Sequence, residues 1–427
     1  MKVAILAMFN GLTPTYSLVN VVAEHLTMLL NHKIEVKLLV TQDCPDSSRY
    51  GIFLDERIEW IKVTNRYKGT LIHWEDYSSE DMTVHDTFFD EADEIAKDFA
   101  KYLKDVTHCI MHDIHYQGWH LVHNIAIRAA QKELPHVKFI AMTHSMPVNR
   151  PIHVEWPISA RYTPMENTVY AYPTSSGLSA LAKQYNISED LCFAINNSLN
   201  LIEDMNDEIK FIASRTNLIE PDLLIVYPAR LTTGKQCEKI AALGGVFKKE
   251  YHQTVKIIYC DFESMDINTD TYKTMIINEG INYGLSIEDM VFTSDLGFLN
   301  GVKRQTVLEL FTLSNLYICP SYAESFGLTI LEAASRGNFL VLNQAVPALE
   351  ELGQHLSVHY MRWPARNFGF DTLETYHPTE FEYLKQHAFD ILNHMWSNAV
   401  LQSKNIVRKR YNPQWIYKNQ LEPLLFP

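Results

Sequence analysis

Two carboxylates, Glu324 and Glu332, lie eight positions apart next to a predicted helix start. An apolar run at residues 316–319 predicts a buried parallel strand, and residues 326–336 have the apolar spacing of a helix. The unpaired N–H groups at a helix start favour a phosphate, and a carboxylate accepts hydrogen bonds from vicinal sugar hydroxyls. We therefore expect a diphosphate at the helix start, with a sugar near Glu324 and a ribose near Glu332.

The backbone of residues 320–337 is expected to supply the phosphate contacts. If both glutamates were helical, about 12 Å would separate them along the axis. The spacing by itself fits an ordinary strand, loop and helix equally well. The residues whose N–H groups are expected to face the phosphate are Ser325, Phe326, Gly327 and Leu328.

Two cations, Arg230 and Lys235, follow another apolar run, which begins at Leu223 and predicts a strand. Arginine binds phosphate oxygens as a fork, and lysine acts as a point charge. Fixed cations of this kind stabilise the negative charge that grows on a leaving diphosphate. Two surface residues on a loop would show the same pattern.

The N-terminal half has two weaker candidates, Gly11 and His144. Residues 3–8 predict a strand, and Gly11 lies in the loop before a predicted helix, an arrangement that often binds phosphate but that also serves as a plain turn. His144 follows a strand predicted at residues 137–141. A histidine at such a position is more often structural than functional.

His112, Asp113 and His115 form a polar cluster after a further apolar run. They suggest a metal site, but no additional ligand motif accompanies them. We expect them to line a cleft at the carboxyl end of a strand, where open α/β sheets place ligands, and we expect no metal.

The composition is that of a globular chain. It has 427 residues, of which 47% are hydrophobic and 21% charged, enough for two domains of ordinary size. The formal net charge of −14 disfavours long-range attraction to nucleic acid or to anionic membranes, although a local basic groove stays possible. No apolar run approaches a membrane span, and the N-terminal run is too short for a signal peptide.

Six cysteines form no C-x-x-C pair, which indicates buried thiols in a reducing compartment and hence a cytoplasmic location. Residues 75–105 predict an amphipathic helix with a solvated acidic face. No basic amphipathic helix is evident, so peripheral membrane contact is not expected. The basic cluster at residues 408–410 is expected to be solvated as well.

These residues resemble a known family. Residues 320–337 spell PSYAESFGLTILEAASRG, which resembles the E-x7-E motif of retaining glycosyltransferases of the GT-B fold, family 4 type, with Ser325 in place of a glycine. Arg230 and Lys235 match the family's G-R-L-x3-K motif. His144 matches a histidine that faces the donor sugar, and Gly11 stands where the family has a glycine-rich loop.

The resemblance also bears on two loops of the second half. Phe292 and Thr293 match the strand whose end touches the nucleobase through its backbone. Residues 260–263 replace the family's G-x-G turn, so base or phosphate contacts there are not carried over.

The resemblance implies an α/β fold of the GT-B type, with two Rossmann-like domains facing across a cleft. The N-terminal, acceptor-side domain would comprise residues 1–203, and the nucleotide-sugar domain residues 204–405. Residues 406–427 would form a helix that returns to the first domain.

The activity implied is transfer of a glycosyl group from a nucleotide diphosphate sugar to an acceptor hydroxyl, with retained anomeric configuration and no metal or other cofactor. Arg230 and Lys235 would stabilise the leaving diphosphate, Glu324 the donor sugar and Glu332 the ribose. His144 would contact the sugar, and no separate general base is assigned, since the leaving phosphate can accept the proton.

Two other classes remain open: a nucleotide-sugar epimerase or hydrolase on the same fold, and a noncatalytic subunit that binds nucleotide. The acceptor also remains open among a glycan, a small molecule and a modified DNA base, with nucleic acid disfavoured by the charge. The sequence does not distinguish uridine from guanosine donors.

Overall fold

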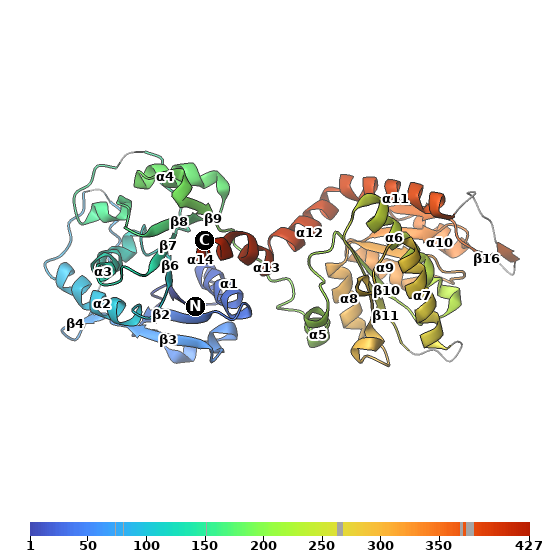
Figure 1. Ribbon diagram of the computed structural model, residues 1–427, viewed down its shortest axis with the longest axis horizontal. Coiled ribbons are helices and arrows are strands. Elements are labelled where there is room, and N and C mark those ends of the chain that lie inside the picture. Colours follow the sequence, from blue (N-terminus) through green and yellow to red (C-terminus); the bar gives the residue numbers. More distant parts are fainter. Residues whose placement is uncertain (73, 80, 151, 263–267, 368–369, 373–379) are drawn as a thin grey trace. The chain divides into compact units, whose positions relative to one another are not determined.

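The computed structural model describes residues 1–72, 74–79, 81–150, 152–262, 268–367, 370–372 and 380–427 (Figure 1). It divides into two compact units. Unit 1 comprises Met1–Leu199 and Pro413–Pro427, and unit 2 comprises Asn200–Asn412. Each unit is built on one parallel sheet with helices packed on it, which confirms the predicted α/β fold class.

Unit 1 contains a seven-stranded sheet in which every pair of neighbours is parallel. Side chains alternate between its two faces, so that Ala4 and Leu6 join one core while Val3 and Ile5 join the other. Both faces are buried, which explains the continuous apolar runs in the sequence. The strands in spatial order are β3 (Ile58–Val63), β2 (Glu35–Thr41), β1 (Lys2–Leu6), β6 (His108–His112), β7 (Lys138–Met142), β8 (Thr168–Tyr172) and β9 (Cys192–Ala194).

Helices cover both faces of this sheet. One core contains buried side chains of three helices, α2 (Phe88–Tyr102), α3 (Leu121–Gln131) and α4 (Leu178–Tyr185). The opposite core contains α1 (Ser17–Asn31) together with the C-terminal pieces α13 (Pro413–Ile416), a π-helical turn (Tyr417–Leu421) and α14 (Glu422–Leu425). A small hairpin joins β4 (Arg66–Tyr67) to β5 (Thr70–Leu71).

The C-terminal segment packs on unit 1, but it is not the single helix that we expected. Helix α12 (Ala399–Arg410) ends before Pro413, which has no N–H to continue a helix. Beyond it, the ring of Tyr417 stacks on His32 at a centroid distance of 3.5 Å. The Gln420 side-chain amide exchanges hydrogen bonds of 2.7 and 2.6 Å with Asn196.

Unit 2 contains a six-stranded parallel sheet. Its strands in spatial order are β12 (Met290–Phe292), β11 (Val255–Cys260), β10 (Leu223–Pro228), β13 (Leu316–Cys319), β14 (Phe339–Asn343) and β15 (Val358–Met361). A separate pair, β16 (Ala365–Asn367) and β17 (Phe370–Thr372), is antiparallel.

The helices of unit 2 form two groups around this sheet. Helix α6 packs on α7 and α11, whereas α8 packs on α5 and α9. Helix α5 follows the first boundary between the units, and Asn206 caps it by accepting from two backbone N–H groups. The units therefore divide at residues 199/200 and 412/413 rather than at 203/204 and 405/406. The bounds are α5 (Asp207–Arg215), α6 (Cys237–Tyr251), α7 (Thr269–Tyr283), α8 (Arg304–Leu313), α9 (Leu328–Ser335), α10 (Pro347–Gly353) and α11 (Glu380–Ser397).

All six cysteines are buried and free, as expected. Among the helices in the described part of the chain, none has both the length and the apolar character needed to cross a bilayer.

Arg408 contradicts the expected solvated basic cluster, because its side chain is only 1% exposed. Its guanidinium donates to the carbonyl oxygens of Leu218 (3.2 Å) and Pro221 (2.6 Å) and to Asn405 Oδ1 (3.0 Å). A buried guanidinium that satisfies buried carbonyls ties α12 to the chain entering β10. Arg410, two residues on, is exposed.

We predict that Arg408→Met lowers the free energy of unfolding by about 3 kcal/mol, because the substitution leaves buried carbonyl groups without donors. Urea denaturation followed by circular dichroism measures the loss. The matched control, Arg410→Met, should change stability by less than about 0.5 kcal/mol. Equal effects of the two variants would contradict the structural role of Arg408.

Candidate functional site

The residues of unit 2 that the sequence predicts for a donor site follow the two central strands of its sheet. Strands β10 and β13 are neighbours; β11 and β12 follow on the outer side of β10, and β14 and β15 follow on the outer side of β13. The loops at the carboxyl ends of such a pair diverge and leave a crevice, which is where open α/β sheets bind ligands. Arg230 and Lys235 follow β10, and Glu324 follows β13.

The structure brings Lys235 and Glu324 together. Lys235 Nζ forms an ion pair with Glu324 Oε1, and Ser321 Oγ donates to the same oxygen at 3.0 Å. The Tyr322 N–H donates to the Gly234 carbonyl at 2.8 Å, which links the two loops directly. The side chains of Lys235 and Glu324 are 31% and 18% exposed, so the pair is accessible from one side.

Two buried side-chain amides support the loop that carries Glu324. Gln236 Nε2 donates to the carbonyls of Pro320 (2.6 Å) and Pro364 (2.8 Å). Asn343 Nδ2 donates to the Ser321 carbonyl at 3.1 Å, and its Oδ1 accepts from backbone N–H groups. Gln236 itself has a left-handed backbone with φ of 49°. These bonds fix the path of the chain where β13 ends.

Helix α9 begins at Leu328, two residues later than predicted. Gly327 has φ of 91°, and a Cβ added there would lie 2.7 Å from Ile330 Cδ1, so the position requires glycine. Glu324 consequently lies in the loop and not in the helix, and the helical separation from Glu332 does not apply. No side chain caps the start of α9, whose first N–H groups are available to an anion.

The surface around the start of α9 is exposed. Phe326 and Leu328 are 55% and 57% exposed, and Ser325 and Arg230 are exposed as well. Large apolar side chains beside cationic and N–H groups suit a ligand that has both an anionic part and a flat or apolar part.

Glu332 lies on α9 and is held by Arg304, the first residue of α8. Arg304 Nε and Nη2 donate to Glu332 Oε1 at 2.9 and 2.6 Å. The Glu332 side chain is 11% exposed, whereas that of Arg304 is 71% exposed. One carboxylate oxygen is thus engaged by an exposed arginine at the surface.

Phe292 and Thr293 are buried, so only their backbone groups could meet a ligand. The Phe292 ring stacks on Tyr259 at 4.8 Å. Buried Asp261 accepts from the Ser294 N–H at 2.9 Å and from Thr293 Oγ1 at 3.3 Å, and it anchors this turn. Asp261 belongs to the 260–263 turn, of which Glu263 lies outside the described residues.

Unit 1 repeats the same topological feature. Strands β1 and β6 are neighbours from which the chain order diverges, and their loops carry Gly11 and Asp113. Nothing lies within 4 Å of a Cβ added at Gly11, so the space in front of it is open. Burial, and then the Asp113 carboxylate, raise the pKa of Tyr16, which places the loop after β1 close to Asp113.

The half-buried His144 lies in a row with two buried histidines, His112 and His25. Its Nε2 is 3.0 Å from His112 Nδ1, and the His112 ring lies 5.1 Å from that of His25. Burial lowers the pKa of His144 to about 4. Burial also lowers the pKa of His25 to about 3, and the nearby His144 contributes a smaller part of that shift. The imidazoles are therefore neutral at pH 7, and His144 can serve as a hydrogen-bonding group but not as a cationic acid.

Asp113 is the group of unit 1 whose acidity suits proton transfer best. Burial raises the pKa of its carboxyl to about 6, against the opposing effect of the His144 N–H, which donates to Oδ1 at 2.8 Å. Its backbone is left-handed, with φ of 58°. A strained, buried carboxyl with a shifted pKa is typical of functional positions.

His115 does not join His112 and Asp113. Its ring packs between Tyr170 and Tyr185, on the opposite face of the sheet from His112, and Arg128 Nη2 lies 3.1 Å from its Nε2. In the described part of the chain, no group of three or more His, Cys, Asp or Glu side chains is arranged to hold a metal ion.

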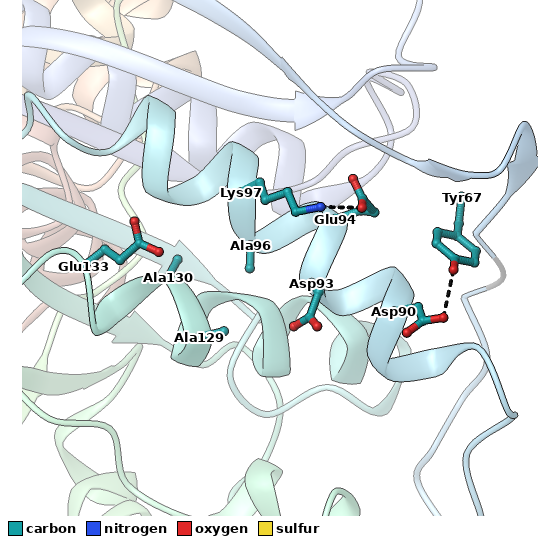
Figure 2. A pocket seen from close by; sticks show the side chains of 9 residues that line it. All are labelled: Tyr67, Asp90, Asp93, Glu94, Ala96, Lys97, Ala129, Ala130 and Glu133. Carbon is teal, nitrogen blue, oxygen red and sulfur yellow. Dashed lines mark hydrogen bonds and ion pairs between the residues drawn. The ribbon is translucent and has the colours of Figure 1, made fainter.

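An acidic groove of about 410 Å³ runs along the surface where α2 packs on α3 (Figure 2). Alanines form its floor, while Asp93 and Glu133 point into it. The exposed acidic face of α2 confirms the prediction, except that Glu91 is buried and accepts from Thr87 Oγ1 at 2.7 Å. No predicted site residue lines this groove.

Four site residues escaped the sequence analysis: Ser321, Arg304, Gln236 and Asn343. Ser321 lies inside the 320–337 motif, and its position three residues before Glu324 could have indicated it. The other three reach the site only through tertiary contacts, and nothing in their local sequence indicates a role.

The part of unit 2 that carries these residues matches a known family. Residues 209–357 match the family model described as glycosyl transferases group 1. The matched segment contains Arg230, Lys235, Glu324 and Glu332, and the match supports sugar transfer as the class of reaction. Among curated protein sequences, none matches the chain.

Solved structures align over nearly the whole chain at low identity. A glycosyltransferase from Rickettsia africae is 16% identical, with 99% of this chain and 97% of that chain covered and a TM-score of 0.35. Anabaena Alr3699/HepE in complex with UDP and glucose is 13% identical, with 100% of each chain covered and a TM-score of 0.36. Since both TM-scores lie below 0.5, these likenesses carry no conclusion about the chain.

We predict that Asp113→Asn stabilises the protein at neutral pH. The raised pKa means that the folded state holds a proton that the unfolded state releases between pH about 4 and 6, so this carboxyl destabilises the fold increasingly as the pH rises through that window. Asparagine keeps the acceptor oxygen and tolerates the left-handed backbone. The gain should be about 2–3 kcal/mol at pH 7.5 and under about 1 kcal/mol at pH 4.5.

Urea denaturation of both proteins at the two pH values measures this difference. Asp93→Asn, at an exposed position of α2, is the control and should show no comparable dependence. A gain of the same size at both pH values would show that the Asp113 charge is not the cause.

Proposed function

We propose that this chain is a retaining, metal-independent glycosyltransferase that moves a sugar from a nucleotide diphosphate sugar to an acceptor hydroxyl. The observation that carries the proposal is the Lys235–Glu324 ion pair at the carboxyl edge of the unit 2 sheet, where β10 and β13 diverge. A cation and a carboxylate held together there can meet, respectively, a diphosphate and the sugar attached to it.

The proposed roles divide the donor into three parts. Lys235 and Arg230 stabilise the charge on the leaving diphosphate, with the N–H groups at the start of α9. Glu324 accepts hydrogen bonds from the sugar, and Glu332 accepts them from the ribose. Gly11 contacts the diphosphate and His144 contacts the sugar, and these two roles rest on the family resemblance.

Donor binding must open the Lys235–Glu324 pair or share it. When a diphosphate approaches, Lys235 exchanges part of its contact with Glu324 for phosphate oxygens, which frees one carboxylate oxygen for a sugar hydroxyl. Ser321 continues to donate to Glu324 and keeps the carboxylate in place. The acceptor hydroxyl loses its proton to the leaving phosphate, so the reaction needs no dedicated base.

We predict that Arg230→Ala and Glu324→Gln each lower the transfer rate by about 10²- to 10³-fold, since each removes a group that stabilises charge in the transition state. The donor is first identified by incubation with a panel of nucleotide sugars and mass spectrometry. Arg215→Ala and Glu351→Gln, at exposed positions of unit 2, are the matched controls and should keep the wild-type rate. If Arg230→Ala and Glu324→Gln both transfer sugar normally, the site assignment is wrong.

The same assay separates the other classes. Release of nucleoside diphosphate without any acceptor would indicate a hydrolase, and interconversion of the sugar without acceptor an epimerase. Calorimetry that detects no nucleoside diphosphate binding would favour a noncatalytic subunit. Nuclear magnetic resonance of the new glycosidic bond measures retention directly.

We predict that Glu332→Gln weakens binding of the donor's nucleoside diphosphate about tenfold, because a charged acceptor for the ribose hydroxyls is lost. The variant should bind the 2′,3′-dideoxy analogue and the ribonucleotide with equal affinity, whereas the wild type should bind the ribonucleotide more tightly. Calorimetric titration of both nucleotides measures this. A preference for ribose that survives in Glu332→Gln would assign the ribose to another residue.

A further inference from the structure

A cavity of about 680 Å³ lies in unit 1 between the sheet and the C-terminal segment, and the function proposed above does not use it. His108, Lys138 and Thr168, the first residues of β6, β7 and β8, line it. The candidate site residues follow the opposite ends of these strands. Pro423, Leu424 and Pro427 complete the cavity from the C-terminal segment.

The strand register places the polar lining residues at one end of the cavity and the apolar lining residues along the rest of it. His108 is paired with Lys138, and Ile140 with Val169 two residues further along. Ile140 belongs to the core that the C-terminal segment shares with the sheet, so its side chain faces that segment. Side chains two positions apart on a strand share a face, and the His108–Lys138 pair therefore faces the C-terminal segment as well. Phe193 of β9, which is paired with Ala171 of β8, extends the apolar part.

The polar end carries the positive charge of Lys138. Lys138 is the only charged side chain among the lining residues, and it has no ion pair within the described chain, although the protein as a whole carries −14. It is exposed at the rim. An anionic group would complement it, and a cationic group would be repelled.

His108 is a second unsatisfied group at this end. It is 5% exposed, its Nδ1 lies 3.0 Å from Thr107 Oγ1, and its Nε2 is buried without a hydrogen-bond partner in the described chain. Burial, followed by the charge of Lys138, lowers the pKa of His108, so the imidazole is neutral. His108 lines the cavity as a neutral polar group, and its Nε2 meets a ligand oxygen only when the ring turns toward the cavity.

We propose that this cavity binds an aliphatic carboxylate of about ten or more carbons, with the carboxylate beside Lys138 and His108 and the chain over Ile140, Val169 and Phe193. The volume is within the range of small-molecule sites, which are mostly apolar with a few polar groups that fix orientation. Each methylene that enters the apolar part strengthens binding about fourfold.

Calorimetric titration of the full chain with octanoate, decanoate and dodecanoate, below their micelle concentrations, tests this site. We expect saturable one-to-one binding that tightens about fifteenfold for each pair of methylenes. Decyltrimethylammonium has the same chain as decanoate and the opposite head charge, and it should bind at least tenfold more weakly. No saturable binding of the carboxylates, or equal binding of the cation, would overturn the proposal.

Variants locate the site. Lys138→Met should weaken decanoate binding three- to tenfold, and Lys132→Met, which removes another exposed lysine of unit 1 outside the cavity, should leave it unchanged. Val169→Phe fills the apolar part and should abolish binding; circular dichroism and thermal melting verify that it folds. If it does not fold, the two lysine variants decide alone, and equal binding by both of them would overturn the proposal. Glu324→Gln should bind decanoate normally, so this test does not depend on sugar transfer.

Discussion

Backbone carbonyl groups at the carboxyl edge of the unit 2 sheet need donors from within the protein, and the candidate site depends on how this need is met. Pro320 follows β13 directly, where its carbonyl is buried. The amide groups of Gln236 and Asn343 donate to the carbonyls of Pro320, Ser321 and Pro364. Without these bonds the loop would carry several unsatisfied polar groups. With them, the loop has one path, and Glu324 has one position.

The same loop positions the other candidate site residues of unit 2. The Tyr322 N–H bonds to Gly234 and so joins the loops after β10 and β13, which brings Lys235 to Glu324. The left-handed Gly327 then turns the chain into α9, so that Glu332 points toward Arg304 on α8. One set of backbone bonds thus orders a cation, two carboxylates and a helix start, the groups on which the proposed binding of a nucleotide diphosphate sugar depends.

Unit 1 uses the same topology for different chemistry. The loops that diverge at β1 and β6 carry Gly11 and Asp113, and β7 adds His144. Here burial, and not ion pairing, sets the protonation: the histidines are neutral and the Asp113 carboxyl holds its proton to about pH 6. At the opposite edge of this sheet, the C-terminal segment leaves the cavity near Lys138. The two edges offer separate surfaces because parallel strands all start on one side and end on the other.

The sequence by itself determined the α/β class and the buried strands, because apolar runs and a helical period are local patterns, whereas the chemistry expected of the 320–337 stretch stays a prediction. It misjudged the start of α9 by two residues, since a glycine in the left-handed region overrode the helical spacing, and it misjudged Arg408, which a tertiary contact buries. Only the tertiary structure decided that Lys235 pairs with Glu324, that Arg304 holds Glu332 and that His112 and His115 face apart. These outcomes depend on which strands become neighbours, and strand order is a property of the whole chain.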